Sequence, residues 1–170
     1  YGVLHDLHAS PNLRSSDLFG STVEDRASSV ILDASGNVYT TGYFKGTADF
    51  DPGEGISNLT SAGESDIFVQ KLDADGNFLW AKSFGESGWD EGQLVVIDAS
   101  GNVYIMGDFD GTVDFDPGSG TYNLTSTGGF DRFVQKLDAS GDFVWAKYLG
   151  GVAYEYANLS IAVDAPGNVY

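Results

Sequence analysis

The sequence predicts an all-β protein built from tandem four-stranded antiparallel units. A gapless alignment of residues 21–85 on residues 86–150 gives 38 identities in 65 positions, which marks an internal repeat. The apolar runs within each unit are rich in Val, Ile, Tyr, Phe and Trp, and no window of useful length has the periodicity of an amphipathic helix. Glycines separate these runs at short intervals, as turns between short strands require.

Each unit contains four strands in a fixed order. The first two, at Val30–Asp33 and Asn37–Phe44, flank a tight turn in which a glycine can adopt positive φ. A longer excursion, Lys45–Asp66, has Gly and Pro at its tip, and we expect it to form a small hairpin of its own. The third and fourth strands, at Ile67–Asp73 and Asn77–Phe84, flank a second turn of the same kind.

The central strands are apolar on both faces, as in residues 67–69 and 143–145. Such strands must be covered on both sides, which happens when sheets stack face to face. A four-stranded antiparallel sheet that is repeated in tandem and buried on both faces is the blade of a β-propeller. The predicted units are a degenerate half-blade at 1–20, blades at 21–85 and 86–150, and a half-blade at 151–170.

Several recurring motifs identify a family resemblance. DASGNVY occurs at 33–39 and 98–104, followed in each unit by DFDPG within GT-x-DFDPG, by NLTS, by D-x-FVQKLDA and by G-x-F-x-WAK. In this combination the chain resembles the bacterial SBBP-type β-propeller repeats over nearly all of 21–170. Residues 1–20 depart from the pattern, because His8 replaces the turn Asp, Pro11 the turn Gly and Ser15 the Trp. The resemblance implies a large exported or surface-associated bacterial protein and no enzymatic activity.

Composition excludes several classes of function. The formal net charge of −17 makes phosphate backbones and anionic membranes poor partners, so we expect neither nucleic-acid binding nor membrane insertion. The absence of Cys excludes disulfides, thiolate nucleophiles and Cys-based metal centres. An apolar content of 42% is too high for a disordered acidic tail, and no run reaches the roughly 20 apolar residues of a membrane-spanning helix.

The register of the repeat predicts head-to-tail assembly of copies. Tyr1 falls on the start of a third strand and Tyr170 falls inside a second strand, so the C-terminal half-blade of one copy can be completed by the N-terminal half-blade of the next. Such a contact closes into a ring or continues as a filament. The apolar residues expected at this contact are Val3, Leu4, Leu7, Leu18, Phe19, Ile161, Val163, Val169 and Tyr170.

Three other interpretations remain open from the sequence. They are a fragment of a longer propeller, a ligand-binding or carbohydrate-binding module, and an accessory domain of a secreted hydrolase. Trp80 and Trp145 occupy equivalent positions and could stack on sugar rings, but apolar neighbours favour packing between blades.

Catalytic motifs are absent and the acidic residues recur. His5 and His8 are the only histidines, and the turn acids appear in every unit, whereas an active site is needed once. Calcium is the one cofactor that the sequence leaves open, because a D-x-D-G-x-x-D run suits its preference for oxygen ligands. The candidate ligands are Asp108, Asp110, Asp114 and Asp116. The alternative is that these aspartates are solvent-exposed residues of turns and bind no metal.

Overall fold

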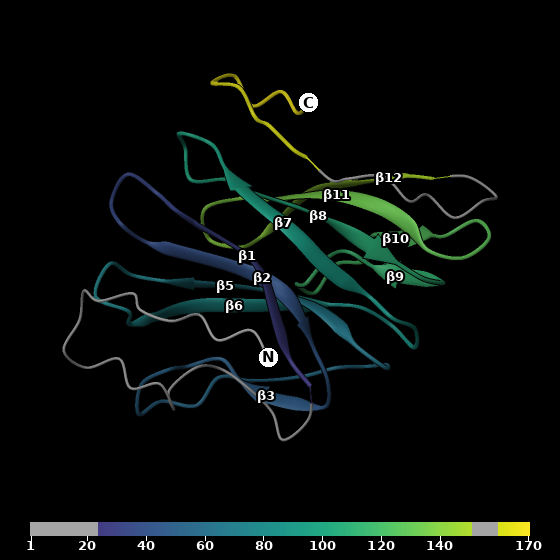
Figure 1. Ribbon diagram of the computed structural model, residues 1–170, viewed down its shortest axis with the longest axis horizontal. Helices are drawn as coiled ribbons and strands as arrows, with labels where there is room; N and C mark the ends of the chain where they lie inside the picture. The colour runs from purple at the N-terminus through teal and green to yellow at the C-terminus, as the bar shows by residue number, and fades with distance from the viewer. Residues whose placement is uncertain (1–23, 151–159) are drawn as a thin grey trace.

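The computed structural model describes residues 24–150 and 160–170, and within them the protein is all-β. Two four-stranded antiparallel sheets are stacked face to face (Figure 1). We call them blade 1 and blade 2. Blade 1 has the order β1-β2-β5-β6, formed by β1 (Arg26–Leu32), β2 (Val38–Phe44), β5 (Asp66–Leu72) and β6 (Phe78–Phe84).

Blade 2 repeats this topology. It is formed by β7 (Glu91–Ile97), β8 (Val103–Phe109), β11 (Asp131–Leu137) and β12 (Phe143–Leu149), in the order β7-β8-β11-β12. The fold is therefore β-propeller-like, as predicted, with two complete blades. The strands of blade 2 lie over those of blade 1, and β7 contacts β1, β2 and β5 (Figure 1).

The excursion between the second and third strands forms the expected small hairpin. It consists of β3 (Thr47–Asp49) with β4 (Asn58–Thr60) in blade 1, and of β9 (Thr112–Asp114) with β10 (Asn123–Thr125) in blade 2. A buried glutamine holds each hairpin to its sheet, because Gln70 Nε2 donates to the carbonyl of Phe50 at 2.6 Å and Gln135 Nε2 to that of Phe115 at 2.5 Å.

The first strand begins earlier than the sequence predicts, at Arg26 instead of Val30. Its first residues pair with the end of β2 through an irregularity between Ala27 and Ser29. This bulge brings the Arg26 carbonyl so close to Gly42 that a Cβ atom there would lie 1.8 Å from the oxygen. The prediction depended on the apolar run that starts at Val30, and a bulge before that run leaves no sign in it. The bulge also explains the glycine in the middle of β2.

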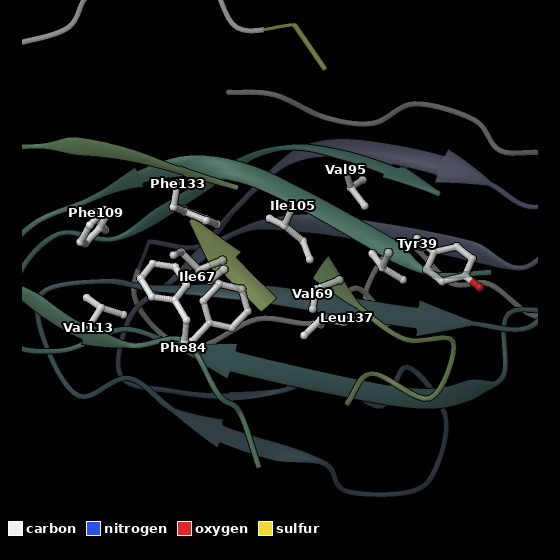
Figure 2. Packing of buried hydrophobic residues seen from close by; sticks show 13 residues of the cluster. Tyr39, Ile67, Val69, Phe84, Val95, Ile105, Phe109, Val113, Phe133 and Leu137 are labelled. Atoms are coloured by element: carbon white, nitrogen blue, oxygen red, sulfur yellow. The ribbon is translucent and has the colours of Figure 1, made fainter. Parts of the chain in front are cut away.

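A shared core joins the two blades. Figure 2 shows Ile67 and Phe84 of blade 1 packed with Ile105 and Phe133 of blade 2. The fully or nearly fully buried members of this cluster come from both four-stranded sheets and from the β9–β10 hairpin, and they are Tyr39, Ile67, Val69, Phe84, Val95, Val103, Ile105, Phe109, Val113, Phe115, Phe133, Leu137 and Ala146. Neither sheet has enough partners of its own to cover both faces, so stacking is what buries the central strands.

No helix within residues 24–150 and 160–170 is long and apolar enough to cross a membrane.

Candidate assembly surface

The recurring turn aspartates have a structural role. Asp33 Oδ1 accepts the backbone N–H groups of Ser35 and Asn37 at 2.9 Å each, and its Oδ2 accepts Asn37 Nδ2 at 2.7 Å. Asp73, Asp98, Asp138 and Asp164 close equivalent turns. The hydrogen bond from the Asn77 side chain is the main reason that the pKa of Asp73 lies below its usual value. These bonds explain why the aspartates recur.

A cluster of four side chains also recurs in both complete blades. In blade 2, Tyr104 OH donates to Asp98 Oδ2 at 3.1 Å, and Lys136 Nζ lies 4.9 Å from the Tyr104 ring centroid. Lys136 Nζ is also 3.8 Å from Asp98 Oδ2, and the Trp145 ring packs edge-on against Tyr104 with centroids 6.2 Å apart. The repeat motifs contain these residues, but sequence reasoning did not single out the Lys and the Tyr. A signal was present, because the same Lys and Tyr recur in both repeats of a chain that has only 8 basic against 25 acidic residues.

Blade 1 contains the same cluster at the equivalent positions. Tyr39 OH donates to Asp33 Oδ2 at 3.4 Å, Lys71 Nζ lies 4.9 Å from the Tyr39 ring centroid, and Trp80 packs edge-on at 6.4 Å. Tyr39 and Tyr104 are both fully buried. A buried tyrosine under an ammonium and an indole is therefore a standard feature of a complete blade.

The C-terminal hairpin, residues 160–170, contains only half of this cluster. Val163 and Val169 form an antiparallel bridge, and Ala162 and Tyr170 exchange backbone hydrogen bonds of 3.0 and 2.9 Å. Tyr170 OH donates to Asp164 Oδ2 at 3.1 Å, as in the complete blades, but the Tyr170 side chain is 74% exposed. The hairpin lies against blade 2, because Tyr104 OH donates to the carbonyl of Gly167 at 3.4 Å.

The seam between the blades shows how the next blade covers its neighbour. The turn of blade 2 between β11 and β12 rests on blade 1, where a Cβ atom at Gly141 would lie 3.2 Å from the Trp80 ring and 3.1 Å from Lys82 Cε. Lys82 Nζ lies 3.9 Å from Asp142 Oδ1. Phe84 packs on Phe115 and Phe133, with ring centroids 5.8 and 6.1 Å apart. The prediction that Trp80 packs between blades is confirmed.

Blade 2 carries the same face, but no other blade covers it in the part of the chain that the structure describes. Trp145, Lys147 and Leu149 are the equivalents of Trp80, Lys82 and Phe84, and we call them the open face of blade 2. Leu149 is 56% exposed, whereas Phe84 is 4% exposed. Lys147 is exposed and Lys82 is half-buried.

The residues predicted for assembly are only partly within the described chain. Ile161, Val163, Val169 and Tyr170 belong to the C-terminal hairpin, where Val163 and Val169 are half-buried. The other five lie outside the described residues, and they are Val3, Leu4, Leu7, Leu18 and Phe19. The predicted half-blade at 1–20 lies there as well.

The four candidate calcium ligands are not brought together. Asp108 Oδ2 accepts Gln93 Nε2 at 2.8 Å, and Asp108 Oδ1 lies 3.4 Å from Arg132 Nε. Asp114 Oδ1 accepts the N–H of Tyr122 at 2.8 Å, and Asp116 Oδ1 that of Gly118 at 2.8 Å. No three His, Cys, Asp or Glu side chains gather into a possible metal site in 24–150 and 160–170, Asp110 included. Linear spacing did not reveal that Asp114 and Asp116 fold into their own loop.

A buried carboxylate at the junction between the blades was missed by sequence reasoning. Asp90 is fully buried, and it accepts the backbone N–H groups of Glu86 at 3.0 Å and Asp110 at 3.1 Å. Burial raises the pKa of Asp90 to about 7, against the effect of these two hydrogen bonds, and the carboxylates of Asp66 and Asp110 raise it further. A signal was present, because Asp25 and Asp90 are one of only two identical pairs in the first ten positions of the repeat.

Two curated proteins are similar to this chain. The regulatory protein FlaEY of Caulobacter vibrioides is 28% identical over 156 residues, which cover 90% of this chain and 16% of that protein. An uncharacterized WD repeat-containing protein of Acanthamoeba polyphaga mimivirus is 29% identical over 130 residues, which cover 67% of this chain and 9% of that protein. The chain thus spans a small part of the length of either relative. No protein-family model matches it. The WD-repeat relative agrees with a β-propeller-type repeat, since WD repeats form propeller blades.

Proposed function

We propose that this chain is a non-enzymatic scaffolding section of a β-propeller-type array, and that the array is extended by blade completion. In this proposal two strands of another copy pair with the C-terminal hairpin and cover the open face of blade 2. The contact is head-to-tail, so the product is a ring or a filament. The resemblance to SBBP-type repeats is the reason for placing this assembly outside a bacterial cell.

The difference in exposure between Leu149 and Phe84 is the main support for this proposal. The two side chains occupy the same position of the repeat, but within residues 24–150 and 160–170 only Phe84 is followed by a blade with paired third and fourth strands. Covering a half-exposed leucine contributes about 1 kcal/mol, and the neighbouring Trp145 gains further apolar contact. The open face of blade 2 therefore has the composition of a blade seam.

The C-terminal hairpin provides the second part of the contact. Its backbone pairing joins Val163 with Val169 and Ala162 with Tyr170, as the first two strands of a blade do. In both complete blades the second strand pairs along its whole length with the third, from Val38 opposite Leu72 to Phe44 opposite Asp66 in blade 1. An added strand would satisfy the corresponding backbone groups of the hairpin.

A binding experiment tests blade completion. The probe is a fluorescently labelled peptide of residues 127–150, which contains β11 and β12 and thus serves as a third and fourth strand. We expect saturable binding to the 170-residue chain by fluorescence anisotropy, and we expect Leu149→Asp in the chain to weaken it at least fivefold. Ile56→Asp is the matched control, because Ile56 is exposed in the loop between β3 and β4. Absence of saturable binding, or equal weakening by both variants, would overturn the proposal.

A further inference from the structure

Three side chains in which the repeats differ meet at the surface beside the connection between the two blades. We propose that Trp89, flanked by Glu64 and Lys45, is a binding site for an uncharged oligosaccharide, with the indole as the surface on which a sugar ring stacks. The site is separate from the open face of blade 2, and the inference does not depend on blade completion. The sequence-based candidates for sugar stacking are Trp80 and Trp145, whereas this site uses the third tryptophan of the chain.

The three side chains of the site do not recur in the repeat. At the offset of 65, the positions of Lys45, Glu64 and Trp89 are taken in the other unit by an aspartate, a glycine and a glutamate, which are Asp110, Gly129 and Glu24. Residues that hold a blade together recur in each unit, as the turn aspartates do, whereas a ligand site is needed only once. The meeting of three non-recurring side chains therefore indicates a role that the fold itself does not require.

The three side chains come from different segments and contact one another. Lys45 lies between β2 and β3, Glu64 between β4 and β5, and Trp89 between β6 and β7. The Lys45 ammonium lies 4.3 Å from the centroid of the Trp89 ring, and Glu64 Oε2 accepts a hydrogen bond from Trp89 Nε1. Lys45 Nζ is also 3.5 Å from Glu24 Oε2. The site therefore consists of one indole with an ammonium over a face of the ring and a carboxylate on its N–H group.

The backbone on both sides of the tryptophan is held in place. Ser65 and Trp89 form a parallel bridge. The N–H of Asp90 donates to the Ser65 carbonyl at 3.0 Å, and the N–H of Glu64 donates to the Gly88 carbonyl at 3.1 Å. Ser65 and Asp90 are fully buried, whereas Trp89 is 43% exposed. An aromatic ring that is fixed before a ligand arrives loses little conformational entropy on binding.

The surroundings of the ring indicate the class of ligand. Lys45 and Glu64 contact it, and the residues shortly before it in the chain, Glu86 and Ser87, are polar and exposed. A stable protein partner would bury a broad interface with an apolar centre. A sugar ring needs less, because its C–H groups pack on one aromatic face while its hydroxyl groups bond to polar side chains around that face. One half-exposed indole among polar side chains matches the sugar.

The charges around the ring favour an uncharged sugar. One oxygen of the Glu64 carboxylate accepts the indole N–H, and the carboxylate can also accept a sugar hydroxyl, while an ammonium such as that of Lys45 only donates. The Lys45 charge is balanced by Glu24, and the whole chain has a formal charge of −17. An acidic saccharide would be repelled by this field. A neutral sugar hydroxyl both donates and accepts, so it can pair with either group.

A glycan array followed by calorimetry tests the site. The labelled 170-residue chain is applied to an array of uncharged cello-, malto-, laminari-, xylo- and chito-oligosaccharides, with oligogalacturonates as the acidic comparison. Isothermal titration with the best-retained uncharged sugar then compares wild type with Trp89→Ala, Trp89→Phe and Phe130→Ala. Phe130 is the matched control, because it is 39% exposed and lies between β10 and β11, in the loop of blade 2 that corresponds to the loop of Glu64.

A second measurement does not depend on how the variants fold. N-bromosuccinimide oxidises exposed indoles, and mass spectrometry of the digested wild-type protein locates the product. A bound sugar should slow the oxidation of Trp89. Melting temperatures of the variants, recorded without sugar, identify any variant whose weaker binding reflects loss of the fold.

We expect at least one uncharged oligosaccharide to be retained and the oligogalacturonates to be absent from the bound set. Trp89→Ala should weaken binding about tenfold or more, Trp89→Phe less, and Phe130→Ala not measurably. Retention of no uncharged sugar, preference for oligogalacturonates, equal weakening by Trp89→Ala and Phe130→Ala, or unchanged oxidation of Trp89 with sugar in excess would each overturn the inference. The peptide assay for blade completion does not involve these residues, so the two proposals can fail separately.

Discussion

The buried carboxylate of Asp90 makes the stability of the protein depend on pH in a specific direction. Asp90 is an acid whose pKa rises from an ordinary value of 3.8, which applies when the chain is unfolded, to about 7 in the folded protein. The folded state therefore binds this proton more tightly than the unfolded state does, and the free energy of unfolding falls as the pH rises from about 4 to about 7. Above about pH 7 the free energy of unfolding has lost the whole contribution of this proton, and below about pH 4 none of that contribution is lost.

The magnitude follows from the two pKa values. The difference between these pKa values corresponds to roughly 4 kcal/mol in total, of which somewhat more than half falls between pH 5 and pH 8. Burial also raises the pKa of Asp66, Glu91 and Asp108, which adds to the trend in the same direction. The turn acids Asp73 and Asp164 have lowered pKa values and act in the opposite direction, but only under more acidic conditions.

Asp90→Asn isolates the effect of the single carboxylate. The amide oxygen can still accept one of the two N–H groups, from Glu86 or from Asp110, while the amide NH2 opposes the other. We expect the variant to be about 1–2 kcal/mol less stable than wild type at pH 5, and at least as stable as wild type at pH 8. Asp75→Asn, which removes an exposed turn charge, is the control for net charge.

Urea unfolding at pH 5, 6, 7 and 8, followed by tryptophan fluorescence, measures these differences. The wild-type and Asp75→Asn curves of stability against pH should run parallel, and the Asp90→Asn curve should cross them. A parallel Asp90→Asn curve would show that the Asp90 carboxylate is ionised in the folded state throughout this range, and the reasoning from its burial would be wrong.

Three further predictions concern the seam, the bulge and the ends of the chain. Phe84→Ala should lower the free energy of unfolding by about 3–4 kcal/mol in urea titrations, whereas Leu149→Ala should cost less than about 1 kcal/mol, and equal costs would contradict the assigned seam. Gly107→Ala should destabilise blade 2 by more than about 2 kcal/mol, because its Cβ would lie 1.9 Å from the Glu91 carbonyl oxygen; an unchanged melting temperature would refute this contact. Removal of residues 1–20 should shift the distribution of oligomers in sedimentation velocity toward smaller species, and an unchanged distribution would contradict head-to-tail contact through that segment.

The blades were accessible from the sequence because their information is local. Turns such as Asp33–Asn37 depend on an aspartate, a glycine and an asparagine within five residues, and the sequence carries turns of this kind at the hairpins of both blades. Apolar runs rich in β-branched and aromatic residues then predict the strands, and the repeat shows that the same unit occurs twice. The resemblance to SBBP-type repeats remains a resemblance.

The start of the first strand and the metal hypothesis depended on geometry that is not local. The bulge at Ala27 brings the Arg26 carbonyl close to Gly42, which lies in the next strand. Asp108, Asp110, Asp114 and Asp116 are close in sequence, but a strand end, a turn and a hairpin loop direct them to different partners.

The local sequence was sufficient to predict the four-stranded unit, because turn residues and strand composition act over a few residues. Only the stacking of one blade on the next determined which residues are functional candidates. Phe84 and Leu149, or Tyr104 and Tyr170, occupy the same repeat position, and they differ in exposure because in the described part of the chain one of each pair is covered by a later strand pair and the other is not. Burial is a property of that contact, so a repeat alone cannot distinguish a seam from an open face.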